Sequence, residues 1–220
     1  MMNHIGTSDL AAMLAESARN LREQREVLSQ LDCVAGDGDH GTTMLRVAEQ
    51  LEAAVKEASS QSLAAMLKNC ASKVLGVDGG ASSALLGTFL KGMSEAADDG
   101  EPDCNQVAGM FESGMNAMLK QTKARPGDKT MVDALAPAVE ALRKAAAQGK
   151  SVAAALEDAD DAARAGVEAT KTMSARYGRA RLLGNKTLGH ADAGATSIAL
   201  IFHGFSQALE ARQEMDHGRH

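Results

Sequence analysis

Apolar residues recur every three or four positions along most of this chain, which is the spacing of one face of an α-helix. Segments rich in glycine and polar residues interrupt the pattern and divide it into eight stripes. The stripes cover Leu10–Leu31, Met44–Val55, Leu63–Val74, a stretch that begins near Ser82, Val107–Leu119, Val132–Leu142, Val152–Val167 and Ile198–Leu209. Because no segment shows a clear alternation of apolar and polar residues, the pattern predicts an all-α protein with eight helices.

The composition favours helices that pack closely through small side chains. Aromatic residues make up only 2% of the chain, tryptophan is absent, and alanine and methionine are frequent. Sheet-rich domains depend instead on valine, isoleucine, tyrosine and phenylalanine. With 220 residues the chain is long enough to bury a substantial core, and we expect a single domain over residues 1–220.

Charge and cysteine content exclude several classes of protein. The formal net charge is −6 and no long basic run is present, which argues against a nucleic-acid surface. No apolar stretch approaches the roughly twenty residues of a membrane span, and the N-terminus lacks the pattern of a signal peptide. Cys33, Cys70 and Cys104 show no C-x-x-C pairing, so we expect reduced thiols in a cytoplasmic protein that binds neither nucleic acid nor membrane.

The connections between the predicted helices are of two kinds, which alternate along the chain. The second, fourth and sixth connections, ASSQS, DDGEPD and QGKS, are ordinary polar turns. The other four are richer in glycine and small polar residues and read AGDGDHGTT, GVDGGASS, ARPGDKTM and GNKTLGHADAGATS. Short connections make successive helices antiparallel, so these four connections and four helix N-termini should meet at one end. Unpaired N–H groups and positive dipole ends predict an anion site there.

Three aspartates in and beside the first of these connections conflict with an anion site unless a cation intervenes. Asp32, Asp37 and Asp39 stand within LDCVAGDGDHG. Two like charges about 4 Å apart repel by roughly 1 kcal/mol in water and about 4 kcal/mol at the effective dielectric of a protein surface. Mg²⁺ reverses this effect, since it prefers carboxylate and phosphate oxygens. We therefore expect these aspartates to hold Mg²⁺, with room for two ions that share phosphate oxygens, as suits phosphoryl transfer.

Other sites that this glycine-rich segment could build disagree with the sequence at particular positions. GDGDHG fits the dinucleotide fingerprint G-x-G-x-x-G, but a helix rather than a strand precedes it. A calcium loop that starts at Asp37 would need glutamate where Ala48 stands. Zinc would find only His40 and the isolated Cys33 nearby.

The segment PGDKTM differs from a Walker A motif because Asp128 separates the glycine from Lys129. Lys129 therefore has two interpretations. It could contact phosphate, or it could decorate the start of a helix. We favour the second interpretation because the neighbouring Asp128 offers its ammonium a partner.

Four motifs resemble, in order and spacing, the nucleotide-binding L subunit (DhaL) of bacterial dihydroxyacetone kinases, which also forms the C-terminal half of single-chain dihydroxyacetone kinases. They are LDCVAGDGDHGTTM, GGASSALLGTF, PGDKTMVDALAPAVEAL and GRARLLGNKTLGHADAGATS, and together they span nearly the whole chain. The resemblance implies an eight-helix antiparallel up-and-down barrel with the nucleotide site at one end. It also implies two Mg²⁺ ions on Asp32, Asp37 and Asp39.

The resemblance further assigns residues to the nucleotide. The positions that match its phosphate-binding segments are His40, Gly41, Thr42, Thr43, Ala81 and Ser82. Thr122 and Met131 match positions that flank the base. The positions that match a cap over the nucleotide are Arg179, Asp192, Ala193 and Gly194. Ala193 stands where the family pattern has proline, which should loosen this cap.

In function, the resemblance implies the phosphoryl-transfer subunit of a kinase for dihydroxyacetone or another short ketose, such as erythrulose. The nucleotide would be ADP or ATP. The ketose would be held on a separate K subunit, so this chain would supply no nucleophile. Two phosphoryl donors stay open, namely ATP and a phosphohistidine subunit of the phosphotransferase system. The alternative function is a non-catalytic ADP-sensing module that docks to another protein.

Overall fold

The computed structural model describes residues 2–57, 62–98 and 100–217, and these residues are largely helical. Its helices are α1 (Thr7–Glu23), α2 (Arg25–Ala35), α3 (His40–Glu57), α4 (Leu63–Leu75), α5 (Gly80–Ala96), α6 (Cys104–Leu119), α7 (Val132–Ala147), α8 (Val152–Thr170), the 3₁₀ helix η1 (Arg179–Thr187) and α9 (Ala193–His217). No strand occurs in these three ranges, where an isolated bridge joins His4 to Asp103. The all-α prediction is thus confirmed there, while residues 58–61 of the predicted ASSQS turn lie outside the described part.

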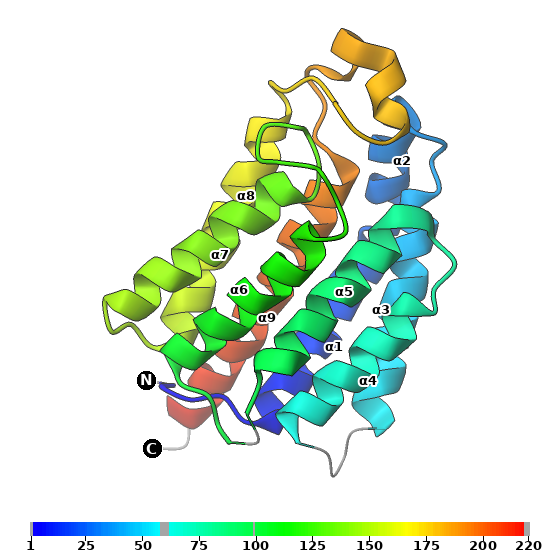
Figure 1. Ribbon diagram of the computed structural model, residues 1–220. Coiled ribbons are helices and arrows are strands. Elements are labelled where there is room, and N and C mark those ends of the chain that lie inside the picture. The colour runs from blue at the N-terminus through cyan, green and yellow to red at the C-terminus, as the bar shows by residue number, and fades with distance from the viewer. Residues whose placement is uncertain (1, 58–61, 99, 218–220) are drawn as a thin grey trace.

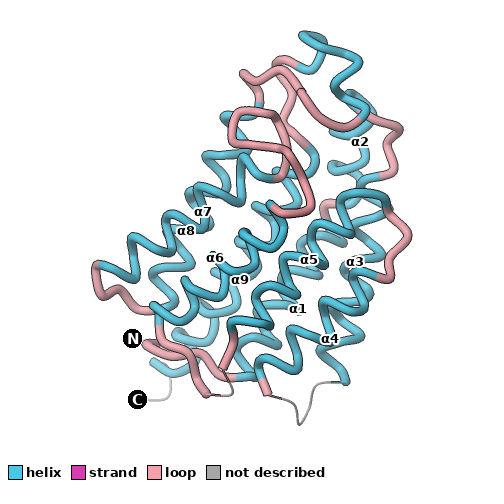
Figure 2. The backbone as a smooth tube through the Cα atoms, in the orientation of Figure 1, coloured by secondary structure: helices cyan, strands magenta, loops and turns pink. Residues whose placement is uncertain are grey.

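The long helices lie side by side along a common direction (Figure 1). In chain order α3 packs on α4, α4 on α5, α5 on α6, α6 on α7, α7 on α8 and α8 on α9, while α1 contacts both α3 and α9. The glycine-rich connections gather at the end of the molecule where α2 and η1 lie (Figure 2). The first turn of α1 lies at the opposite end (Figure 1). Of the helices described, none combines the length and the apolar character needed to cross a bilayer.

Helix starts at the plain end carry local caps. Ser62 and Ser151 each accept a hydrogen bond from a backbone N–H of the first turn, both at 3.3 Å. At the start of α6, Asp103 and Gln106 exchange two such bonds of 2.9 Å, a capping box. At the other end, the residue before α5 is Gly79, which makes no side-chain cap. The first N–H groups of α5 are therefore left for another acceptor.

The first apolar stripe, predicted as one helix, is divided in the structure. Helices α1 and α2 meet at Gln24, whose φ of −94° and ψ of 11° leave the helical region. Helix α2 lies close to the start of α3, because a Cβ at Gly41 would come within 2.9 Å of the backbone nitrogen of Ser29. The described residues thus form nine α-helices and one 3₁₀ helix rather than eight helices. The division places Asp32, in the last turn of α2, at the glycine-rich end.

A cluster of phenylalanines holds the middle of the bundle together. The ring of Phe111 on α6 lies 5.9 Å from Phe89 on α5, and 5.4 and 5.8 Å from Phe202 and Phe205 on α9. All of these side chains are fully buried. Burying each one contributes roughly 1.5–3 kcal/mol to folding, which fixes three helices whose ends carry glycine-rich connections.

Candidate functional site

All four glycine-rich connections line one pocket of about 420 Å³ at the end of the bundle. The residues assigned from sequence that line it are Asp32, Asp37, Asp39, His40, Ala81, Ser82, Thr122, Met131, Arg179, Asp192, Ala193 and Gly194. Gly41, Thr42 and Thr43 are not among the lining residues. They lie farther into α3, where Gly41 and Thr43 are buried against the neighbouring elements. Antiparallel packing therefore brings together most of the residues that the sequence singled out.

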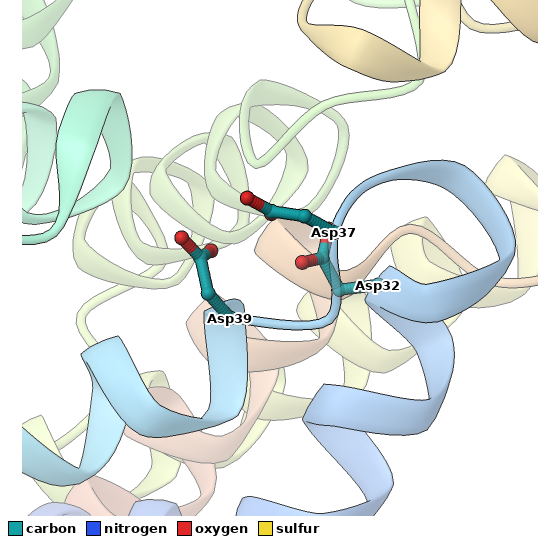
Figure 3. A group of neighbouring side chains, drawn as sticks. All are labelled: Asp32, Asp37 and Asp39. Carbon is teal, nitrogen blue, oxygen red and sulfur yellow. The ribbon is translucent and has the colours of Figure 1, made fainter.

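The three aspartates form a compact acidic group at one side of this pocket. Each offers a carboxylate oxygen, and these three atoms lie within 4.8 Å of one another. Asp32 comes from α2, Asp37 from the connection and Asp39 from the residue before α3, and their carboxylates point toward a common space (Figure 3). Gly38, with φ of 77°, provides the turn that brings Asp37 and Asp39 to the same side.

The electrostatics of this group fit a hard cation. Burial raises the pKa of Asp39, and the charges of Asp37 and Asp32 raise it further. These carboxylates therefore repel one another when no cation lies between them. All three candidate ligands are carboxylate oxygens, which suit Mg²⁺ and suit zinc poorly.

Arg179, the first residue of η1, contributes a positive charge to the same space. Its guanidinium forms an ion pair with the carboxylate of Asp37. Guanidinium groups bind phosphate oxygens with the same paired geometry that they use for carboxylates. Arg179 can therefore leave Asp37 and bind a phosphate once the carboxylate of Asp37 coordinates a metal cation.

His40, the first residue of α3, lines the pocket and links the start of α3 to the starts of α5 and α9. Its Nε2 lies 2.5 Å from Oγ of Ser197 on α9, and its Nδ1 lies 3.4 Å from Oγ of Ser82 on α5. Burial lowers the pKa of His40, against the opposing charge of Asp32. The imidazole is therefore held neutral at physiological pH, where it orients hydroxyl groups at the starts of α5 and α9.

Helix starts supply the donors of this pocket. Helix α5 begins at Gly80, whose φ is 66°, and Gly79, Gly80 and Ala81 bring no side-chain acceptor to its first turn. Helix α9 differs, because Asp192 accepts a hydrogen bond of 2.7 Å from the N–H of Ala195. Burial raises the pKa of Asp192 to about 6. The start of α5 is consequently the clearest place for an anion.

The pocket is also lined by Lys129, which the sequence interpretation placed at a helix start, and by Tyr177, which that interpretation did not consider. The Nζ of Lys129 is buried and donates to backbone carbonyls, so its favoured pairing with Asp128 is wrong. Asp128 instead accepts from the N–H of Arg125 at 2.8 Å. Tyr177 donates from its hydroxyl to the carbonyl of Lys123 at 2.9 Å. It is the only tyrosine in the sequence and stands beside the fourth motif, which was a usable signal.

Comparison with known proteins gives the family. Residues 34–207 match the DAK2 domain. The ADP-binding subunit DhaL of a PEP-dependent dihydroxyacetone kinase from Escherichia coli K12 is 38% identical over 179 residues, which are 81% of this chain and 85% of that protein. A D-erythrulose kinase from Mycolicibacterium smegmatis is 36% identical over 186 residues, or 83% of this chain and 32% of that protein.

A solved structure agrees with these sequence matches. The dihydroxyacetone kinase from C. freundii, in complex with AMP-PNP and Mg²⁺, superposes with a TM-score of 0.72 at 26% identity. The match covers 94% of this chain and 35% of that one, so this chain spans about a third of that kinase. The DAK2 match covers well over half of the sequence, in agreement with the motifs and the pocket. The chain therefore belongs to the DAK2 domain family.

Proposed function

We propose that this protein is the nucleotide-binding, phosphoryl-transfer subunit of a kinase for dihydroxyacetone or a similar short ketose. ADP or ATP would bind in the pocket with its phosphates beside Asp32, Asp37 and Asp39. The observation that carries the proposal is the group of three carboxylates in a pocket that also contains the uncapped start of α5. Carboxylates alone would repel phosphate, whereas carboxylates with Mg²⁺ attract it.

Each side of the pocket has a part in this proposal. Mg²⁺ held by Asp32, Asp37 and Asp39 would neutralise phosphate charge, and two ions are the expected number. The first turn of α5, at Ala81 and Ser82, donates backbone N–H groups to the phosphates. Thr122 and Met131 pack against the base. Arg179 covers the phosphates from η1.

The remaining assigned residues act around these contacts. We propose that Asp192, Ala193 and Gly194 close the pocket at the start of α9. His40 orients Ser82, and Gly41, Thr42 and Thr43 support the phosphate side from within α3. Phosphoryl transfer depends mainly on position and on neutralised charge, so the chain needs no nucleophile of its own.

The partners and setting of the protein belong to the same proposal. The acceptor ketose would be held on a separate K subunit, in line with the DhaL relative, which is one subunit of a kinase. The phosphoryl donor would be ATP or a phosphohistidine protein. Helices α1 and α3 to α9 contact one another in order and α9 returns to α1, which supports an up-and-down barrel of these eight helices, with α2 and η1 at one end, as one domain over residues 1–220. The cysteines lack disulfide bonds, which is consistent with a cytoplasmic protein.

Erythrulose is a second candidate acceptor. The observation that favours it is the similarity to a D-erythrulose kinase over 83% of this chain. Because the acceptor would sit on the K subunit, both ketoses are compatible with the same nucleotide pocket.

The test is reconstitution. The purified protein is mixed with a K-type subunit, Mg²⁺ and either dihydroxyacetone or erythrulose, and the donor is either ATP or a phosphohistidine protein. Formation of sugar phosphate is followed by ³¹P NMR. We expect product only when both subunits are present, and we expect Asp39→Asn to abolish it.

The matched control is Asp161→Asn, which removes an exposed carboxylate from the surface of α8. It should leave the rate unchanged. Tight ADP binding without sugar phosphate from any ketose and donor would refute the kinase proposal and favour an ADP sensor.

A further inference from the structure

Lys129 is a buried lysine in an unusual backbone conformation. Its exposed fraction is 4%, and its φ of 60° is the only positive φ at a non-glycine residue among those described. Left-handed backbone costs free energy for a residue with a Cβ, and burial of an ammonium costs more unless it is well paired. Both costs fall on one residue, so its surroundings must compensate for them.

The ammonium of Lys129 joins two segments that are distant in sequence. Its Nζ donates to the carbonyl of Thr170 at 2.6 Å and to the carbonyl of His190 at 2.6 Å. Thr170 is the last residue of α8, and His190 precedes α9 by a few residues. Lys129 thus links the two ends of residues 171–190, which we call the cap segment.

Further hydrogen bonds close the base of the cap segment at the same place. The N–H of Gly189 donates to the carbonyl of Lys171 at 2.8 Å, and the N–H of Asp192 donates to Oγ1 of Thr170 at 2.9 Å. The carboxylates of Asp192 and Asp133 oppose the lowering of the Lys129 pKa by burial. The charged ammonium is therefore stabilised where it holds the base together.

Beyond this base, the cap segment is mostly exposed. The side chains of Arg179 and Leu182 extend from η1, and Leu182 is 82% exposed. Contacts of the segment with the body of the protein include the hydrogen bond from the N–H of Arg176 to the carbonyl of Asp128, at 3.1 Å. Asp128 immediately precedes Lys129, so this attachment and the link at the base start from adjacent residues.

We propose that Lys129 is a positioning residue that fixes the cap segment over the pocket and thereby sets where Arg179 lies. Its effect on nucleotide retention rests on the proposed function. Its effect on the cap segment does not, because the link joins residues of this chain alone. Lys129 acts through backbone carbonyls rather than through the reacting phosphates.

Hydrogen–deuterium exchange of the nucleotide-free protein tests the link directly. Lys129→Met keeps an unbranched side chain, one atom shorter, and removes the three ammonium donors. We expect at least tenfold faster exchange in residues 171–190, with unchanged exchange in residues 40–57. Lys123→Met is the matched control, because Lys123 lies in the same connection and is exposed. Equal exchange of the cap segment in Lys129→Met and the wild type would overturn the proposal.

Thr170→Val tests a neighbouring hydrogen bond at the same base, whether or not Lys129→Met folds. It removes the acceptor Oγ1 for the N–H of Asp192 and leaves both carbonyls of the Lys129 link. We expect faster exchange of the cap segment, by a smaller factor than for Lys129→Met. Unchanged exchange in Thr170→Val would contradict a base held by these bonds.

A double-mutant cycle separates positioning from direct contact with phosphate. The dissociation rate of ADP is measured for the wild type, Lys129→Met, Arg179→Gln and the double variant. If Lys129 acts through Arg179, the second substitution adds little to the first. Independent, multiplicative effects would show direct phosphate contact and overturn the positioning role. A chain that binds no ADP under any condition would refute the proposed function, while the exchange result would still stand.

Discussion

Asp39→Asn is expected to change nucleotide binding in opposite directions with and without magnesium. With Mg²⁺ present, the substitution removes one ligand of the cation that joins the acidic group to the phosphates, so ADP binds more weakly. In EDTA, it removes a negative charge that repels the phosphates, so ADP binds more tightly. This reversal is specific to a cation-bridged site, because a damaged pocket would bind less well in both solutions.

The magnitude follows from the spacing of the acidic group. One carboxylate oxygen from each aspartate lies within 4.8 Å of the others, and we take the same distance between Asp39 and a phosphate bound beside it. Two unit charges 4.8 Å apart interact by about 1 kcal/mol in water and about 3.5 kcal/mol at the effective dielectric of a protein surface. Asp39 is exposed, so we expect the lower part of this range, about 1–2 kcal/mol. That corresponds to roughly 5- to 30-fold tighter binding in EDTA.

The assay is titration of a fluorescent ADP analogue at pH 8, in excess Mg²⁺ and in EDTA, at one fixed ionic strength. In Mg²⁺ we expect at least about tenfold weaker binding by Asp39→Asn, which is about 1.4 kcal/mol. Asp161→Asn, an exposed carboxylate on α8, should match the wild type in both solutions. Weaker binding by Asp39→Asn in EDTA, or equal binding in both solutions, would refute the electrostatic reasoning.

Three further predictions concern pH, packing and thiol reactivity. Burial raises the pKa of Asp192 to about 6, so between about pH 4 and 6 the folded protein keeps a proton that the unfolded chain releases. As pH rises across that window, the wild type should lose up to about 3 kcal/mol of unfolding free energy relative to Asp192→Asn, as measured by urea denaturation. Gly204→Ala should lower the free energy of unfolding by about 3 kcal/mol, because its Cβ would lie 2.5 Å from Cα of Ser17. Gly109→Ala on α6, whose Cβ would have nothing within 4 Å, should raise it by up to about 1 kcal/mol, and equal melting temperatures of the two variants would contradict this. Burial raises the pKa of Cys70 to about 12, so a thiol reagent should modify exposed Cys33 in the native protein and reach Cys70 only on unfolding.

The sequence by itself determined most of the helices and the composition of the site. Helix periodicity and capping act within a few residues, so local signals such as Ser62 and Ser151 mark helix starts reliably. The alternation of plain and glycine-rich connections was also local information, and short connections convert it into a common end. The three aspartates predicted a cation site because their charges lie within eight positions of one another. The order of residues along the chain therefore predicted both the helical bundle and the grouping of the three aspartates.

Tertiary structure alone decided the features that depend on distant partners. The break at Gln24 has neither glycine nor proline to mark it, and close packing of α2 on α3 accompanies it. Lys129 meets carbonyls 41 and 61 positions away, so its neighbour Asp128 was a misleading guide. The contact of His40 with Ser197 spans 157 positions. The physical reason is that a buried polar group is satisfied by whichever donor or acceptor packing brings near, and the sequence does not encode that proximity locally.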